Sequence, residues 1–215
     1  MEITNKTLGL LLVAAVTISL FGTIISINRM NRIMEMSSLS GYATTAQGNV
    51  SVYVNTSTSI RFAIDYVDWG TGYVNTTGGY VNCTLRTDGT PNSAGCVGFN
   101  ELNQGFVLEN DGTTTATVQL YSNANASQFI GGTSDGGGPQ FMYKVSQNES
   151  NSCISGLTPT SFTDVNTTSP GTTICPSSNF NFTDSADSIK IDLYVNIPYT
   201  VPPGQKLAVL TATAS

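Results

Sequence analysis

The stretch SIKIDLYVNI, residues 188–197, gives the clearest structural signal in this chain. Apolar residues occupy every second position and more polar residues fill the positions between them, so that Ile189, Ile191, Leu193 and Val195 alternate with Lys190, Asp192, Tyr194 and Asn196. Alternation with a period of two is typical of a β-strand that has one face against a core. The stretch therefore predicts a strand.

Similar alternation recurs at short intervals from residue 49 onward, between turns rich in Gly, Pro, Asn and Asp. Further strands are predicted at residues 50–54, 60–67, 80–86, 105–108, 115–121, 140–145 and 205–214, and loops at 131–139 and 158–178. The turns Asn110-Asp111-Gly112 and Pro202-Pro203-Gly204 predict two hairpins, the second one closing the chain. Since no helical period lies between these segments, we expect a mainly β fold in which residues 49–215 form one antiparallel β-sandwich, jelly-roll or immunoglobulin-like.

The start of the chain has a different composition. Residues 8–27 form an uncharged and mostly apolar run, and an α-helix of ~20 residues rises ~30 Å, the thickness of a bilayer's hydrocarbon core. We expect a retained helix over residues 1–37, followed by a flexible linker at 38–48. A cleaved signal peptide is the alternative, but the run is long for one and no small-residue cleavage site follows closely. Arg29 and Arg32 lie on the C-terminal flank of the run. The positive-inside rule assigns such a flank to the cytoplasm, which is opposite to the expectation for an exported C-terminal domain.

Small residues gather on one face of this predicted helix, namely Ala15, Ser19, Gly22, Thr23 and Ser26. Such a face lets helices approach closely in an apolar medium, so the helix has two possible partners, the lipid bilayer or copies of itself. A hydrophobic helix that continues to about Met36 as a stalk resembles the N-terminal helix of type IV pilins and archaeal pilin-like filament subunits. That resemblance implies helices bundled in a filament core with the heads facing outward.

Composition excludes several classes of function. The chain has 8 Lys and Arg against 14 Asp and Glu, a net charge of −6, and its cationic residues are scattered. An acidic chain without a basic patch has no electrostatic footprint for nucleic acid. The chain has no histidine, which removes Ser-His-Asp and Cys-His nucleophile systems and histidine-based zinc proteases.

The four cysteines all lie in the polar part of the chain and allow three pairings. We favour Cys83 with Cys96 and Cys153 with Cys175, because each bond then closes one loop rich in Gly, Ser and Thr. The alternative is a zinc site, whose usual short cysteine spacing is missing here. Disulfides place the domain in an oxidising compartment, at the cell surface or outside the cell.

Nine Asn-x-Ser/Thr sequons occur, of which eight lie beyond the helix. Their density fits an exported glycoprotein, and equally the polar composition of loops. The candidate glycosylation sites are Asn49, Asn55, Asn75, Asn82, Asn125, Asn148, Asn166 and Asn181.

Three other patterns in the sequence are candidate sites. Gly132-Thr-Ser-Asp-Gly136 matches the G-x-S-x-G motif, but it lies in a predicted glycine loop rather than between a strand and a helix. Asp184 with Asp187, or Asp65 with Asp68, offers an acid–base pair or a Ca²⁺ site, and solvated turn acids are the simpler interpretation. Trp69 with Tyr66, Tyr73 and Tyr80 predicts either an aromatic patch for surface glycans or proteins, or ordinary strand and core residues.

The segments Phe106–Leu120 and Ile189–Ala214 look like parts of the sandwich of TasA and camelysin-type surface proteins. The resemblance implies a fibre-forming or cell-surface domain, and without histidine it carries no metalloprotease activity. We therefore expect no enzyme, no metal and no cofactor, but a structural or adhesive cell-surface protein held by its helix. The alternatives are a pilin-like filament subunit and a surface hydrolase that uses Asp or Glu.

Overall fold

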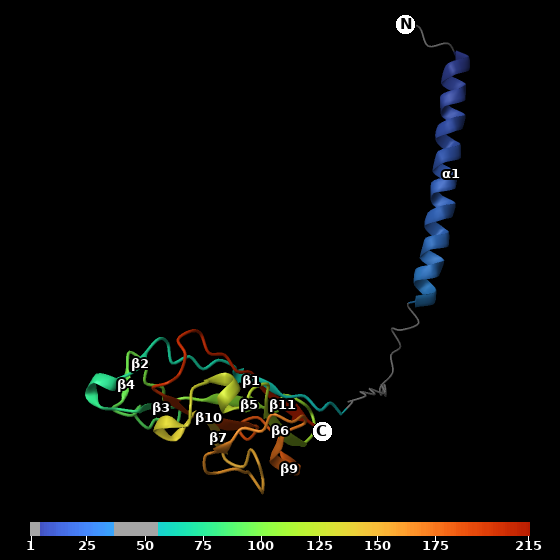
Figure 1. Ribbon diagram of the computed structural model, residues 1–215. Coiled ribbons are helices and arrows are strands. Elements are labelled where there is room, and N and C mark those ends of the chain that lie inside the picture. The colour runs from blue at the N-terminus through green and yellow to red at the C-terminus, as the bar shows by residue number, and fades with distance from the viewer. Residues whose placement is uncertain (1–4, 37–55) are drawn as a thin grey trace. The chain divides into compact units, whose positions relative to one another are not determined.

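The computed structural model describes residues 5–36 and 56–215. Contacts divide the chain into two units, Met1–Tyr53 and Val54–Ser215 (Figure 1). The first contains the helix α1 (Asn5–Met36), and the second is mainly β with antiparallel pairing throughout the described strands. The prediction of an apolar N-terminal helix followed by antiparallel sheets is confirmed. The predicted linker at 38–48, the predicted strand at 50–54 and the sequons at Asn49 and Asn55 lie outside the described residues.

Helix α1 contains 32 residues, which corresponds to a length of about 48 Å. Two of its threonine hydroxyls are satisfied by the helix itself. Thr17 Oγ1 donates to Ala14 O (2.8 Å) and Thr23 Oγ1 donates to Ser19 O (2.6 Å). Because these hydroxyls bond to carbonyls of the preceding turn, they can lie in an apolar medium without a further partner.

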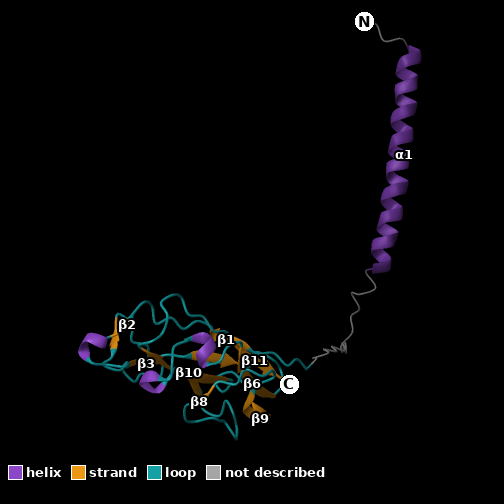
Figure 2. Cartoon of the chain, in the orientation of Figure 1, coloured by secondary structure: helices purple, strands orange, loops and turns teal. Residues whose placement is uncertain are grey.

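The larger sheet is built around β10 (Ser188–Pro198), the strand that the sequence signals most clearly (Figure 2). Its strand order is β1-β5-β10-β7-β8, and β3 also pairs with β10. The first half of β10 pairs with β5 and the second half with β3, while β7 pairs with the opposite edge. The other strands are β1 (Arg61–Ile64), β3 (Asn82–Arg86), β5 (Phe106–Glu109), β7 (Gln140–Gln147) and β8 (Thr163–Asp164).

The second sheet has the order β11-β6-β9, with β6 (Ala116–Ser122) between β9 (Thr172–Phe180) and β11 (Leu210–Ala214). A two-stranded sheet pairs β2 (Tyr73–Val74) with β4 (Cys96–Val97). Within residues 56–215, short helices occupy three of the connections: η2 (Thr76–Gly78), α2 (Ala126–Phe129) and η3 (Asp135–Gly137).

One hydrophobic core takes side chains from both larger sheets. Every second residue of β6 and β7 is buried, in keeping with the alternation in the sequence. The core includes Leu85, Leu108, Val118, Leu120, Phe141, Tyr143, Val145, Ile174, Phe180, Ile189, Ile191, Leu193 and Val195. These residues come from strands far apart in the sequence, so the domain is held by long-range contacts.

Both predicted hairpins are wrong. The turn at 110–112 leads from β5 in the larger sheet to β6 in the second sheet, and the chain between β10 and β11 changes sheet in the same way. Asn110 is buried and its Nδ2 donates to Thr114 O and Phe180 O, both at 3.0 Å, which fixes this turn between the sheets. Since β10 already has partners along both edges, it leaves no edge free for β11.

The predicted loop at 158–178 contains β8 and most of β9, so that prediction is wrong as well. Pro176 interrupts the pattern of β9 and favours a loop on sequence alone. In the structure, Ser177 (φ 57°) and Ser178 (φ 53°) form a left-handed excursion at this point. The register between β6 and β9 shifts there, from Val118 opposite Cys175 to Ala116 opposite Phe180.

Candidate functional sites and surfaces

The structure forms the two favoured disulfides, Cys83–Cys96 and Cys153–Cys175. The first joins β3 to β4 and closes a loop with a sequence separation of 13, and the second joins the loop after β7 to β9 with a separation of 22. The alternative of a zinc site is therefore wrong for these cysteines. Disulfides persist in oxidising compartments, which fits a location outside the cytoplasm.

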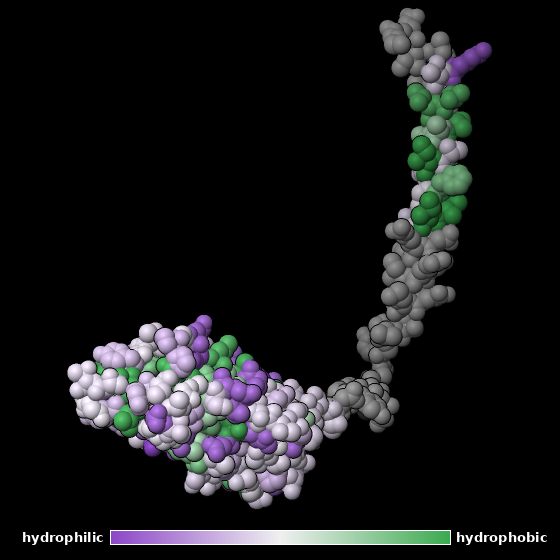
Figure 3. All heavy atoms as spheres, viewed as in Figure 1, coloured by the Kyte–Doolittle hydropathy of each residue, from purple (hydrophilic) through white to green (hydrophobic). Residues whose placement is uncertain are grey.

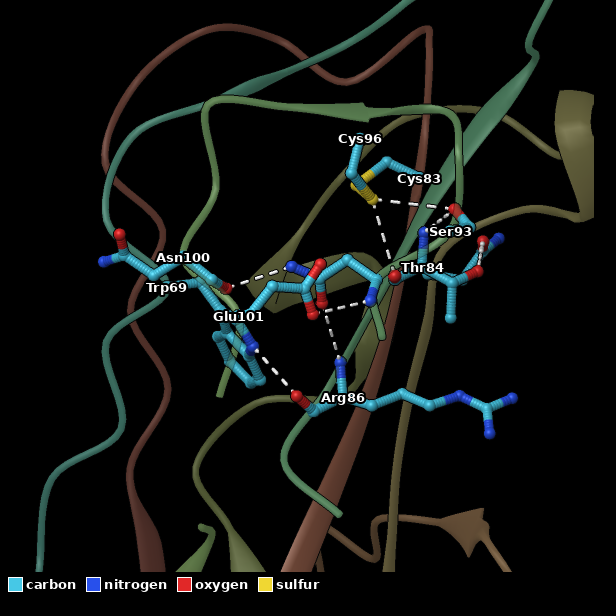
Figure 4. The surroundings of a disulfide bond; sticks show 10 residues. Trp69, Cys83, Thr84, Arg86, Ser93, Cys96, Asn100 and Glu101 are labelled. Atoms are coloured by element: carbon cyan, nitrogen blue, oxygen red, sulfur yellow. Dashed lines mark hydrogen bonds between the residues drawn. A yellow bond between two sulfur atoms is a disulfide. The ribbon is translucent and has the colours of Figure 1, made fainter. Parts of the chain in front are cut away.

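Polar contacts hold the loop closed by Cys83–Cys96 against its neighbours (Figure 4). Asn92 N donates to Glu101 Oε2 (2.8 Å), and Asn92 Nδ2 donates to Asn100 O (3.0 Å). Ser93 Oγ accepts from Thr84 N (2.8 Å) on β3. The loop is thus bonded both to β3 and to the segment that contains Asn100 and Glu101.

The predicted aromatic patch divides into two kinds of residue. Trp69 is half-buried against the core and its Nε1 donates to Arg86 O (3.4 Å), so it is a structural residue. Tyr66, Tyr73 and Tyr80 are exposed to 71%, 63% and 40%. The three tyrosine rings thus leave polar-tipped aromatic surface open to solvent without the tryptophan that the sequence grouped with them.

The carboxylates of the hydrolase alternative form an acidic group that also includes Glu149. Asp187 N donates to Glu149 Oε2 (3.0 Å). Burial raises the pKa of Asp187, and the nearby Glu149, Glu109 and Asp184 carboxylates raise it further. Glu149 has no counterpart in the sequence argument, because nothing local links it to residue 187. The arrangement is one of like charges at a turn.

The Asp65 and Asp68 pair and the G-x-S-x-G motif do not form a catalytic or metal-binding arrangement among the described residues. Asp68 Oδ1 accepts from Gly70 N (2.8 Å) within a turn, and Asp65 is exposed. Ser134 lies exposed in a loop, with no strand directly before it and only the three-residue helix η3 after it, so the strand–turn–helix setting of the motif is missing. Among the described residues, no group of three or more His, Cys, Asp or Glu side chains is placed to hold a metal ion.

A cluster that the sequence did not reveal lies on the outer face of the larger sheet. The guanidinium of Arg86 lies 5.0 Å from the Tyr194 ring centroid, and Lys144 Nζ lies 4.7 Å from that of Phe162. Phe162 and Tyr194 contact each other at 5.5 Å. These cation–π contacts fasten the segment before β8 to the sheet. Only the paired register of β3, β7 and β10 brings these positions together.

Lys144 also pairs with Asp88, at 2.6 Å between Nζ and Oδ2. Burial raises the pKa of Asp88, but hydrogen bonds from Lys144 and Thr90 together with the Lys144 charge lower it by more, so that it falls from 3.8 to about 2. The lysine is thereby engaged twice, by the carboxylate and by the Phe162 ring. Arg86 and Lys144 thus both have partners within the domain, and we interpret the cluster as a structural contact that holds the segment before β8 on the sheet.

The small-residue face of α1 is fully exposed within its own unit. Ala15, Ser19, Gly22, Thr23 and Ser26 are all exposed, as are the larger apolar residues around them (Figure 3). The window Gly9–Ser26 has a mean hydropathy of 2.2, is 0% buried, and is long and apolar enough to cross a membrane. Such a surface needs a cover of lipid or of protein.

Six of the eight candidate glycosylation sites lie in the described domain: Asn75, Asn82, Asn125, Asn148, Asn166 and Asn181. All are exposed or half-buried.

No protein family model, no curated protein and no solved structure matches this chain. Its function therefore has to be inferred from its own helix, sheets and surface.

Proposed function

We propose that this chain is a non-enzymatic cell-surface protein in which a retained N-terminal helix holds a disulfide-bonded β-sandwich domain outside the membrane. Its role is structural or adhesive, and its contacts are surface glycans or proteins. The observation that carries the proposal is the exposed apolar surface of α1, whose window Gly9–Ser26 is 0% buried. Covering that surface requires a bilayer or other helices.

The domain supports this proposal by its covalent chemistry. One disulfide joins β3 to β4 and the other joins the loop after β7 to β9, and Cys83, Cys153 and Cys175 are at most 1% exposed. Disulfides persist in an oxidising environment and stabilise a domain there. The exposed tyrosines at 66, 73 and 80 supply surface for contact with a partner.

The acidic group supports a structural role better than a hydrolase. A glycosidase separates the roles of its two carboxyls by giving them different environments in a cleft that is lined by aromatic residues. Here Asp184 is exposed, and the carboxylates near Asp187 all act on its pKa in the same direction. The hydrolase alternative is tested by alanine at Asp184 and Asp187, which abolishes any activity that depends on them.

A pilin-like filament subunit is the second candidate function. Helix α1 is about 48 Å long and so exceeds the ~30 Å of a hydrocarbon core, which favours a stalk or a helix bundle over a simple anchor. The small residues on one face allow close helix packing. In this version the helices leave the membrane and become the core of a filament.

Electron microscopy of shed and detergent-extracted material separates the two candidates. Monomers in detergent micelles support the simple anchor, whereas regular filaments that contain the chain support the subunit. Ser19→Leu and Thr17→Leu form a matched pair of variants, because both add the same side chain on opposite faces of α1. A helix bundle is disrupted by Ser19→Leu and tolerates Thr17→Leu, while a membrane anchor tolerates both.

A further inference from the structure

The six described sequons differ in what the asparagine amide nitrogen does. An N-linked glycan replaces one of the two hydrogens on Nδ2, so a site suits it best where Nδ2 makes no hydrogen bond within the folded domain. Where Nδ2 donates a hydrogen bond to another segment, a sugar on Nδ2 lies close to the residues around the acceptor. The hydrogen bonds of each asparagine therefore sort the sites.

Asn82 and Asn148 use Nδ2 to hold separate segments together. Asn82 lies on β3, and its Nδ2 donates to Gly136 O (2.9 Å) in η3. Asn148 Nδ2 donates to Ser188 Oγ (2.8 Å) at the start of β10. At both positions the acceptor belongs to a half-buried or buried residue, Gly136 or Ser188, so a pyranose ring on Nδ2 has to fit beside a contact that joins two segments.

The other four asparagines use Oδ1 instead and make no hydrogen bond through Nδ2 in the described structure. Their Oδ1 atoms accept backbone N–H groups two or three residues ahead, in helix caps and turns. The pairs are Asn75 with Gly78 N (3.0 Å), Asn125 with Gln128 N (3.0 Å), Asn166 with Thr168 N (2.9 Å) and Asn181 with Thr183 N (3.1 Å). Each side chain is thus fixed by its oxygen while its nitrogen stays free.

Asn125 has the most complete surroundings for a sugar. It is exposed, it caps α2, and the sequon hydroxyl of Ser127 donates to its Oδ1 (2.9 Å). A hollow of about 360 Å³ opens beside it. Pro139, Val165 and Asp164 line this hollow together with the buried Phe141, so apolar residues and one acidic residue border the space beside Asn125.

We propose that Asn75, Asn125, Asn166 and Asn181 carry N-linked glycans, that Asn82 and Asn148 do not, and that the first sugar at Asn125 lies in this hollow. In the transfer step, Nδ2 attacks C1 of a sugar in a lipid-pyrophosphate-linked oligosaccharide. The N–C1 bond forms, the bond between C1 and the phosphate oxygen breaks, the lipid pyrophosphate leaves with the electron pair, and the amide loses one proton. The inference rests on the proposed function, because the domain has to be exported to meet such a donor.

The test is glycopeptide mass spectrometry of the full chain from cells that export and N-glycosylate proteins. We expect sugar on peptides containing Asn75, Asn125, Asn166 and Asn181, and bare peptides for Asn82 and Asn148. Comparable occupancy at Asn82 or Asn148 overturns the proposal, and so does a domain with all four predicted sites bare. Oxidised cysteines and membrane or filament association, measured on the same sample, show whether the proposed function stands when the glycans are missing.

Sequon variants that keep the asparagine give a matched control. Ser127→Ala and Ser150→Ala both remove an exposed serine hydroxyl, from the sequons of Asn125 and Asn148. We expect Ser127→Ala to remove one glycan's mass from the intact protein and Ser150→Ala to leave the mass distribution unchanged apart from the lost oxygen. The reverse result contradicts the assignment.

Discussion

Thr87 Oγ1 lies 3.1 Å from Asp192 Oδ1, to which it donates, and it also accepts from Leu193 N at 2.9 Å. Thr87 is fully buried and directly follows the end of β3, at the point along β10 where the pairing with β5 stops and the pairing with β3 starts. β5 and β3 pair with successive parts of the same edge of β10. In the gap between them, the Thr87 hydroxyl takes the place of a strand as the hydrogen-bond partner of β10. Gly105 lies on the other side of this gap and approaches β10 so closely that a Cβ there would lie 2.1 Å from Ile191 O.

We expect Thr87→Val to destabilise the domain by about 1–3 kcal/mol, because it keeps the shape of the side chain but leaves Leu193 N–H and Asp192 without this partner. Urea unfolding followed by tryptophan fluorescence measures the change. Thr211→Val on β11 is the control, since no side-chain hydrogen bond links Thr211 to the other described residues. Equal effects of the two variants contradict the role assigned to Thr87.

Asp88→Asn removes the anionic partner of Lys144. Because the pKa of Asp88 falls to about 2 in the fold, the carboxylate adds stability above pH ~4 that is lost as the pH falls toward 2. We expect the variant to be less stable by about 1–2 kcal/mol at pH 7 and to lose less stability between pH 4 and 2. Exposed Asp65→Asn serves as the control, and parallel pH curves for wild type and Asp88→Asn refute this prediction.

Asp187→Asn has the opposite sign. The pKa of Asp187 is raised by burial and by neighbouring carboxylates, so its contribution to stability is complete at low pH and is lost as the pH rises through the raised value. The variant should therefore unfold at higher urea concentration than wild type at pH 7, and the difference should disappear below pH ~4. A loss of stability at pH 7 shows that the carboxylate is a needed structural anion instead.

Replacing either cysteine pair with serine should lower the free energy of unfolding by about 3 kcal/mol, with the larger loss for Cys153 and Cys175. The reason is the sequence separation of 22 for that pair against 13 for Cys83 and Cys96, since a longer loop regains more entropy in the unfolded chain. Urea titrations of the two double variants test the order. If the Cys83 and Cys96 pair contributes more, native contacts rather than loop entropy set its value.

The sequence predicted the parts of the fold that depend on local pattern. The alternation at 188–197 gives β10, the apolar run gives α1, and local cysteine pairing gives both disulfides. It failed where a strand's partner is decided at long range. The turn at 110–112 has hairpin residues, yet the buried Asn110 amide bonds across to Phe180 O and sends the chain to the other sheet.

The alternation also suggested that only one face of β10 is covered, whereas Asp192 and Asn196 on its polar face are each 3% exposed. Loops that no local pattern connects to β10 lie over that face. Asn196 Nδ2 donates to Gly138 O (2.6 Å), and the Phe162 ring contacts Tyr194. The Arg86, Lys144, Phe162 and Tyr194 cluster and the Glu149–Asp187 contact depend on the same long-range register, so no sequence signal revealed them.

The account depends above all on helix α1 remaining part of the mature protein. The most direct measurement is the intact mass of the enzymatically deglycosylated protein, isolated from the membrane and filament fractions of cells that export it. We predict a mass that includes α1 (Asn5–Met36), with the protein in those fractions. A soluble secreted protein whose mass corresponds to a chain that begins at or after residue 37 contradicts the proposed function. In that case α1 is a removed signal and neither anchors nor assembles the domain.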